Sequence, residues 1–327
     1  WYLALLMAFL MVGRRAALPE RCTLYKVVLL ANITLLALTG ILQLFYDNGK
    51  LLWIRESSQA LRAIGPYVNP NHFAGMMELA VPWLLGYCWW RFRKAGVQAF
   101  KEPQAPIALG AGLLCMVAGI LAASKMAAAL MVAALLVLIL LSLQTVRSRI
   151  IAVLVAAVIL TGLAVGLRNT ELVRRIDDFS SATAGNLGQY ERVVAWNAAL
   201  PMVADYPATG VGFGAFGHVF TSYVPPGEPG LWAHLHNDYL EVIVEGGLVA
   251  GLLLLSLMWL YWVRVYRVQF RGSLTSAIAP ARLGMVLGLA SLTVHGLVDF
   301  NHQIPGNALM YIAIAAIALH RHAGDES

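Results

Sequence analysis

Long apolar runs recur along this chain of 327 residues, and they constrain its fold more than any other feature. A helix needs about 20 apolar residues to cross a bilayer. Nine segments reach or approach that length: 1–13, 25–46, 72–90, 105–123, 126–144, 150–167, 239–263, 277–298 and 303–319. Only 12% of the residues are charged, against about 25% in a soluble domain. The sequence therefore predicts an all-α, polytopic integral membrane helix bundle and excludes a water-soluble enzyme.

The positions of the basic residues predict which side of the membrane each connection faces. Taking every second connection as cytoplasmic places fifteen of the 23 lysines and arginines there, with four acidic residues. Lys and Arg are enriched in cytoplasmic loops, so the C-terminus is expected in the cytoplasm and the long connections 47–71 and 168–238 outside. The net charge of +6 is then a signal of membrane topology, and nucleic acid is excluded as a partner.

This pattern predicts three parts. Residues 1–167 form membrane segments with the outer loop 47–71, residues 168–238 form a large, mainly helical periplasmic loop, and residues 239–327 form the last membrane segments and a short cytoplasmic tail. Because Trp1 already lies inside an apolar run, we expect the chain to be an N-terminally truncated part of a longer protein.

The large outer loop holds most of the polar chemistry, and a loop of this length is usually functional or separately folded. Residues 172–179 are a short helix candidate, and residues 190–204 are a stronger one that ends at Asp205-Tyr206-Pro207. Helical spacing predicts one apolar face on the stronger helix, made of Trp196, Ala199, Leu200 and Val203.

The sequence HNDYLE at 236–241 lies where this loop meets a predicted membrane helix. Histidine titrates near neutral pH, so His236 is a candidate general base for a bound hydroxyl. The alternative is an interfacial residue held by a helix cap or by lipid headgroups. The preceding His234 completes HLHND, which resembles the start of a metallo-β-lactamase zinc motif, but Tyr239 stands where that motif has another histidine. We therefore expect no metal and no other cofactor.

Two cations on the outer side are candidates for binding an anionic ligand. Arg192 begins an amphipathic helix one turn from Trp196, and a guanidinium binds phosphate through two hydrogen bonds without losing its charge. The alternative for Arg192 is a solvated helix surface. Lys125 lies in a tight turn between two apolar segments, where it either extends to the membrane surface or meets an anionic ligand.

Further polar groups lie in or beside the membrane segments. Asn71 and His72 open one segment, and Glu78 follows about two turns later. Ionisable groups at membrane depth are functional candidates. His295 and Asp299 are one turn apart in a predicted helix, and we expect these two side chains to pair for structure.

The glycines at 210, 212 and 214 have two interpretations. Glycine-rich loops can hold phosphate, but no Lys-Ser/Thr follows these glycines and no strand precedes them, as a P-loop or a dinucleotide site requires. We interpret them as a packed turn.

Taken together, these pieces resemble the O-antigen ligase/polymerase superfamily of bacterial envelope glycan enzymes. The resemblance covers most of the chain and rests on the order and spacing of its motifs. They are NPNHFAG at 69–75, SK at 124–125, Arg192 with Trp196, Pro207 followed by GVGFGAF at 210–216, HN at 236–237 with Gly247 after nine further residues, and HGLVDFN at 295–301.

The chain departs from the family pattern at two places. Lys125 is followed by Met126, where many members have Ser-Arg-Gly; the charge is kept, but an ammonium cannot bind phosphate in the bidentate manner of Arg. Ala250 replaces the Gly, Thr or Tyr expected three residues after Gly247.

The resemblance implies a glycosyltransferase at the periplasmic face of the bacterial inner membrane, acting without a metal. The donor is a glycan linked to undecaprenyl diphosphate. The acceptor is lipid A-core in a ligase of lipopolysaccharide biosynthesis, or a second lipid-linked glycan in a polysaccharide polymerase. We expect His236 to be the catalytic base and Arg192 and Lys125 to hold the diphosphate. The further substrate-binding candidates are Asn237, Asn71 and His72.

Other functions stay open at this point. Ligases and polymerases of the superfamily share these motifs. A non-catalytic transporter of lipid-linked glycan would bind the same anionic lipid without a base, and transporters often show internal repeats. We see no repeat, and the polar residues gather on one predicted membrane face, which favours an enzyme.

Overall fold

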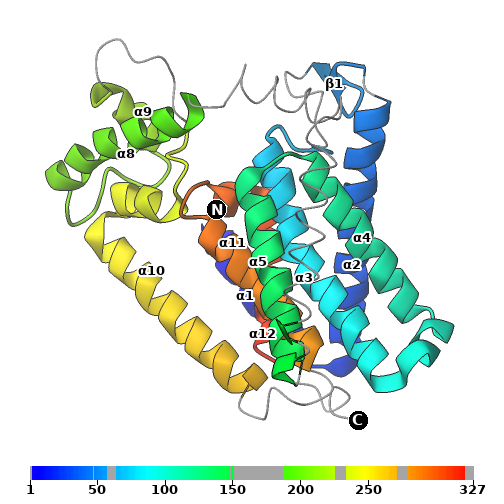
Figure 1. Cartoon of the computed structure of the whole chain (residues 1–327). Helices are drawn as coiled ribbons and strands as arrows, with labels where there is room; N and C mark the ends of the chain where they lie inside the picture. The colour runs from blue at the N-terminus through cyan, green and yellow to red at the C-terminus, as the bar shows by residue number, and fades with distance from the viewer. Residues whose placement is uncertain are drawn as a thin grey trace. The chain divides into compact units, whose positions relative to one another are not determined.

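The computed structural model describes residues 2–46, 48–56, 64–143, 145–147, 149–150, 187–224, 233–270 and 279–320. Helices dominate this part of the chain (Figure 1). The elements are α1 (Tyr2–Ala16), α2 (Pro19–Phe45), β1 (Lys50–Leu51), β2 (Arg55–Glu56), α3 (Pro70–Ala95), η1 (Gly96–Lys101), α4 (Gln104–Leu121), α5 (Lys125–Ser142), α8 (Leu187–Asp205), α9 (Phe216–Val219), η2 (Phe220–Ser222), α10 (Asp238–Phe270), α11 (Ala279–His295), η3 (Asn301–Gln303) and α12 (Pro305–Ala318).

Four helical stretches are long and apolar enough to cross a membrane: Cys22–Phe45, Gln104–Leu121, Lys125–Ser142 and Asp238–Phe270. The all-α membrane class is therefore confirmed, with one small addition, since β1 and β2 form an antiparallel hairpin in the connection 47–71. The other predicted segments coincide with helices too, except 150–167, which lies outside the described residues beyond Ile150. The count of nine spans stays a prediction.

The chain divides into two compact units, each described by itself. The first unit is Trp1–Arg149, Val263–His295 and Asn301–Ser327, and the second is Ile150–Trp262 and Gly296–Phe300. Helix α10 contributes its first part to the second unit and its last turns to the first. The division predicted from the sequence, into residues 1–167, 168–238 and 239–327, concerns the sides of the membrane and stays a prediction.

In the first unit α3 packs along α11, and glycines bring the two backbones together. A Cβ added to Gly284 would lie 2.0 Å from the Pro82 carbonyl oxygen, and one added to Gly288 would lie 2.2 Å from the Leu79 carbonyl oxygen. Small residues at helix interfaces permit this approach between membrane helices. The α3 helix itself starts at a cap, because the Asn69 side chain accepts a hydrogen bond from the Asn71 backbone N–H at 2.8 Å.

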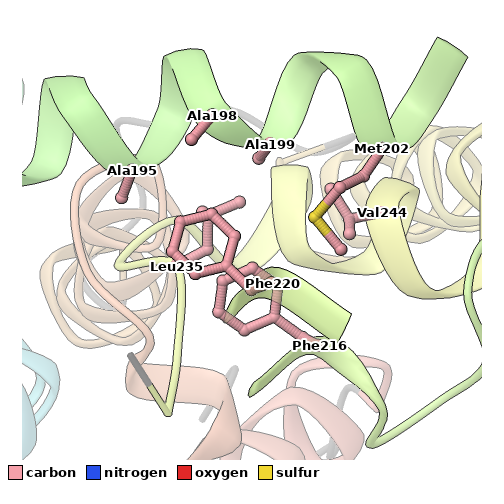
Figure 2. Packing of buried hydrophobic residues seen from close by; sticks show 8 residues of the cluster. All are labelled: Ala195, Ala198, Ala199, Met202, Phe216, Phe220, Leu235 and Val244. Atoms are coloured by element: carbon pink, nitrogen blue, oxygen red, sulfur yellow. The ribbon is translucent and has the colours of Figure 1, made fainter. Parts of the chain in front are cut away.

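Alanines of α8 line the core of the second unit (Figure 2). They let the rings of Phe216 and Phe220 pack beneath the helix, with ring centres 4.7 Å apart. The cluster is completed by Leu235 and Val244. Its α8 members are Ala195, Ala198, Ala199 and Met202.

This core confirms the helix predicted at 190–204 but corrects its apolar face. Leu200, expected to be buried, is 56% exposed. The other three predicted members, Trp196, Ala199 and Val203, do pack on this core, but the Phe rings lie beneath the alanine side and leave Leu200 outside the buried stripe. The other helix candidate of the loop, 172–179, lies outside the described residues.

The glycines at 210, 212 and 214, interpreted as a packed turn, pack on α10. Val211 N–H donates to the Val244 carbonyl at 2.9 Å, and Gly212 N–H donates to the Glu245 carbonyl at 2.8 Å. A Cβ on Gly210, whose φ is +65°, would lie 2.3 Å from the Glu245 carbonyl carbon. Helix α10 is itself kinked at Gly247, where φ is +71°. The two backbones therefore touch at positions where only glycine fits.

We predict that Gly288→Val lowers the stability of the first unit by about 1–3 kcal/mol or more, the usual effect of forcing extra atoms into a packed interface. The matched control is Gly110→Val, because an added Cβ at this exposed glycine of α4 meets nothing within 4 Å. Thermal unfolding of the two variants in detergent measures the difference. Equal unfolding midpoints for the two variants would show that the close approach of α3 and α11 does not limit stability.

Candidate active site

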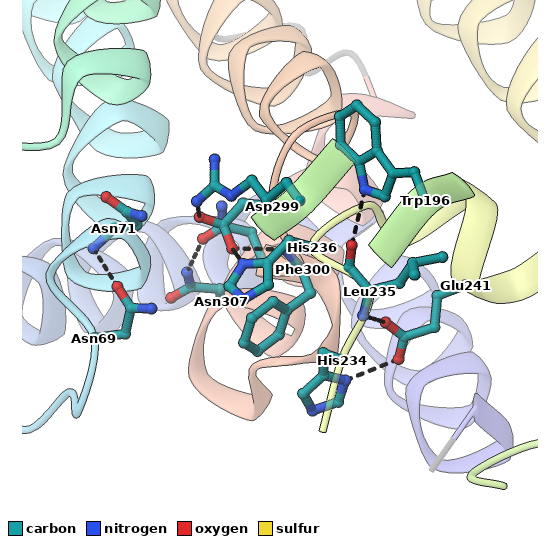
Figure 3. A network of polar contacts seen from close by, with 12 residues as sticks. Asn69, Asn71, Trp196, His234, Leu235, His236, Glu241, Asp299, Phe300 and Asn307 are labelled. Carbon is teal, nitrogen blue, oxygen red and sulfur yellow. Dashed lines mark hydrogen bonds and ion pairs between the residues drawn. The ribbon is translucent and has the colours of Figure 1, made fainter. Parts of the chain in front are cut away.

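A buried carboxylate links two of the predicted site residues in the second unit (Figure 3). Asp299, only 1% exposed, lies in the Gly296–Phe300 segment that follows α11. Its Oδ1 is 3.2 Å from His236 Nδ1, and its Oδ2 is 3.5 Å from Arg192 Nη2. The candidate base and the candidate cation thus share one acidic partner.

The expectation that Asp299 pairs with His295 was wrong. It rested on one helical turn of spacing, but α11 ends at His295 and the chain turns at Gly296. His295 instead faces Glu78 inside the first unit, with Nδ1 and Oε2 3.0 Å apart and both side chains at most 1% exposed. That pair brings two buried ionisable groups into contact.

The contact with Asp299 decides which nitrogen of His236 can act as a base. An ionised carboxylate only accepts hydrogen bonds, so beside an ionised Asp299 the neutral ring is assigned its hydrogen at Nδ1 and its lone pair at Nε2. The side chain is 24% exposed, and so is reachable. His236 also has a φ of +52°, an uncommon backbone conformation for a residue other than glycine.

Neighbouring contacts hold the backbone around His236. The Trp196 indole N–H donates to the Leu235 carbonyl at 2.9 Å, which ties α8 to this segment. Asn237 caps α10, since its Oδ1 accepts from the backbone N–H groups of Tyr239 and Leu240 at 3.1 and 3.0 Å. This cap accounts for the side-chain oxygen of Asn237, and its role in substrate binding stays a prediction.

A second histidine–carboxylate pair lies beside the first, and sequence reasoning missed it. His234 Nδ1 is 2.8 Å from Glu241 Oε1, and the other oxygen of Glu241 accepts from the Leu235 N–H at 2.8 Å. The His234 ring stacks on Phe300 at 4.3 Å, and the His236 ring meets Phe300 edge-on at 4.7 Å. The only sequence signal was the HLH pattern, which we interpreted as a fragment of a metal motif.

Two opposing effects set the pKa of His234. Burial is the largest effect and lowers the pKa, since it disfavours the imidazolium. The hydrogen bond and charge of Glu241, with the charges of Glu245 and Asp238, raise the pKa, and together they prevail. The net pKa of His234 is therefore above the ordinary value of 6.5.

The remaining predicted site residues belong to the first unit. Lys125 is exposed and is the first residue of α5, after a tight turn in which Ala123 has a φ of +56°. Asn71 is half-buried beside the cap of α3. His72 is buried, and its backbone carbonyl accepts from the Asn307 amide at 2.8 Å. Their binding roles stay predictions.

Across the described residues, no three His, Cys, Asp or Glu side chains gather in an arrangement suited to a metal ion. The second histidine of HLHND is instead held by Asp299.

A family model described as O-antigen ligase matches residues 110–255. This part of the chain is therefore similar to the O-antigen ligase family. The resemblance inferred from the motifs is thereby confirmed, and no curated protein matches the chain. The matched region includes Lys125, Arg192, His236 and Asn237, whereas Asp299 lies beyond its end.

We predict that the His234–Glu241 pair stabilises the second unit more at acid than at alkaline pH. A raised pKa means that the folded state holds the proton more tightly than the unfolded state. The contribution is therefore fully present below the ordinary value of 6.5 and is lost as pH rises through the raised pKa. Unfolding midpoints of the native protein and His234→Gln, measured from about pH 5 to about pH 9, should converge as pH rises.

The control for this comparison is His218→Gln, which changes an exposed histidine on α9. This control should show no pH-dependent difference from the native protein. A difference for His234→Gln that stays constant across the range would contradict the assignment of the pair.

Proposed function

We propose that this chain is a membrane glycosyltransferase of the O-antigen ligase type. It moves a glycan from an undecaprenyl-diphosphate-linked donor to an acceptor hydroxyl at the periplasmic face of the bacterial inner membrane. The observation that carries the proposal is the buried Asp299 between a histidine and an arginine, at 3.2 and 3.5 Å. A base and a fixed cation side by side suit the transfer of a group from a phosphate leaving group.

In the proposed reaction, His236 Nε2 takes the proton of the acceptor hydroxyl. The hydroxyl oxygen then attacks the anomeric carbon of the donor sugar, while the bond from that carbon to the diphosphate oxygen breaks. Undecaprenyl diphosphate leaves with the electron pair, and the anomeric centre inverts. Asp299 holds Nδ1–H and stabilises the imidazolium that forms, the role that a buried carboxylate plays beside histidine bases.

Arg192 is proposed to hold the diphosphate. Its 3.5 Å separation from Asp299 is longer than the 2.7–2.9 Å typical of a strong charged hydrogen bond, and a guanidinium has five N–H donors. The side chain is 26% exposed. Lys125, which belongs to the first unit, is proposed as a further cation that binds diphosphate. A cation at a helix N-terminus opposes the helix dipole, so its charge does not serve to stabilise α5.

The test uses purified protein in lipid with an undecaprenyl-diphosphate glycan, with and without lipid A-core, and products sized by mass. Glycan moved to lipid A-core identifies a ligase, and longer glycans still on undecaprenyl diphosphate identify a polymerase. Transfer is expected to survive excess chelator. No consumption of a matched donor by folded protein would contradict the proposal and favour a transporter.

His236→Ala is expected to lower transfer by about 10²–10⁴-fold, the usual contribution of a general base, with normal membrane insertion. The control is His218→Ala, an exposed histidine of the same unit, which should transfer normally. Near-native transfer by folded His236→Ala would remove His236 as the base.

Arg192→Ala is expected to raise KM for the donor and lower kcat, because the charge beside the leaving group is lost. Arg192→Lys should recover part of the activity, since it restores charge without bidentate geometry. Steady-state kinetics with varied donor distinguish the two variants. Full activity of Arg192→Ala would contradict diphosphate binding and favour the alternative that Arg192 only belongs to a solvated helix surface.

A further inference from the structure

We propose that His234 is a positioning residue for His236 and acts through the ring of Phe300. This inference rests on the proposed function. Its basis is the order in which three rings meet: His234 lies parallel to Phe300, with 19° between the ring planes, and His236 meets Phe300 at 78°. The two histidines therefore contact one phenyl ring in different ways.

His236 needs a restraint beyond its contact with Asp299. One hydrogen bond at 3.2 Å holds Nδ1, but the ring can still tilt through small rotations about its Cα–Cβ and Cβ–Cγ bonds. An edge-to-face contact is directional, because the ring edge is positive and the face is negative. The Phe300 contact at 4.7 Å thus supplies a second restraint, and together the two contacts aim Nε2.

Phe300 in turn needs a fixed neighbour, and His234 supplies one. Phe300 is only half-buried, so the core does not hold its ring on all sides. The ring of His234 stacks on it with centres 4.3 Å apart. Phe300 is also tied at its backbone, since its N–H donates to Asp299 Oδ1 at 2.9 Å. Asp299 and Phe300, adjacent in the chain, thus each restrain His236.

Glu241 makes His234 rigid enough for this role. One oxygen of Glu241 holds the His234 Nδ1 and the other holds the next backbone N–H, that of Leu235, both at 2.8 Å. The carboxylate is 3% exposed, so water does not weaken these contacts. The ring and the backbone that carries it are therefore fixed by one buried group.

Burial alone does not account for this arrangement. His234 is 34% exposed, whereas a histidine placed only to fill the core would be enclosed. A direct contact between His234 and substrate is the competing role, and it would raise KM. A positioning residue instead lowers kcat and leaves KM nearly unchanged.

The experiment compares His234→Phe, which keeps the stacked ring, with His234→Gln, which keeps a hydrogen-bonding side chain and loses the ring. In the transfer assay, His234→Gln should lower kcat by about 10- to 100-fold, the effect expected of a misplaced catalytic group. Its KM should stay within about threefold of the native value, and His234→Phe, which keeps the ring but loses the bond to Glu241, should lose less kcat than His234→Gln. Native kcat in His234→Gln, or raised KM in both variants, would overturn the proposal.

Phe300 provides a second test that does not depend on the folding of the His234 variants. Phe300→Leu keeps an apolar side chain without a ring and should show the same loss of kcat, while Phe300→Tyr should restore it. His218→Gln, on the exposed surface of α9, is the matched control for both sets. Native kcat in Phe300→Leu would contradict the role of the phenyl ring.

A chemical readout separates failure of this inference from failure of the proposed function. Diethyl pyrocarbonate modifies accessible imidazoles, and mass spectrometry gives the rate at His236. That rate should change by about threefold or more in His234→Gln and Phe300→Leu, and by less in His234→Phe. Unchanged rates would overturn the positioning role even if transfer occurs, whereas absence of transfer by the native protein would overturn only the proposed function.

Discussion

The buried carboxylate of Asp299 is the interaction on which the polar chemistry of the second unit depends. A charge removed from water is costly unless it is paired and hydrogen-bonded. Oδ1 of Asp299 contacts His236, just before α10, and accepts from the Phe300 N–H, while Oδ2 forms a longer ion pair with Arg192 of α8. The pairing that stabilises the carboxylate also sets the tautomer of one partner and holds the other in place. Stability and the proposed chemistry therefore share the same contacts.

The first turns of α10 organise segments that are distant in the chain. Glu241 fixes His234 and Leu235. One turn later, Glu245 accepts from the N–H groups of Gly214 and Phe216 at 2.9 and 3.2 Å. The helix dipole favours an acidic group in the first turn, where Glu241 lies, and the two glutamates also supply acceptors for the N–H groups of the buried Leu235 and Phe216. The first turns of α10 thus hold two separate segments that precede the helix, 214–216 and 234–235.

The same physical rule acts in the first unit. Glu78 and His295 meet at 3.0 Å where almost no surface is exposed, and the Asn307 amide donates to the His72 carbonyl and to Asn301 at 2.8 Å. Apolar side chains and glycines let α3 and α11 approach, and paired polar groups then lie within that interface. In a membrane protein such pairing is required, because no water is present at depth to satisfy these groups.

The sequence by itself determined the features that depend on neighbouring residues. Apolar length predicted the helices, α8 ends at Asp205 just before Tyr206-Pro207 as expected, and the motifs around Arg192 and His236 gave the resemblance that the match over residues 110–255 supports. Only the tertiary structure decided the partners. Because α11 ends at His295, Asp299 lies beside His236 and does not continue the helix. Because Phe216 and Phe220 pack under the alanines of α8, Leu200 is exposed. Glu241 reaches His234 across the start of a helix. Periodicity describes one element at a time, whereas a buried charge takes the partner that the folded chain brings within reach.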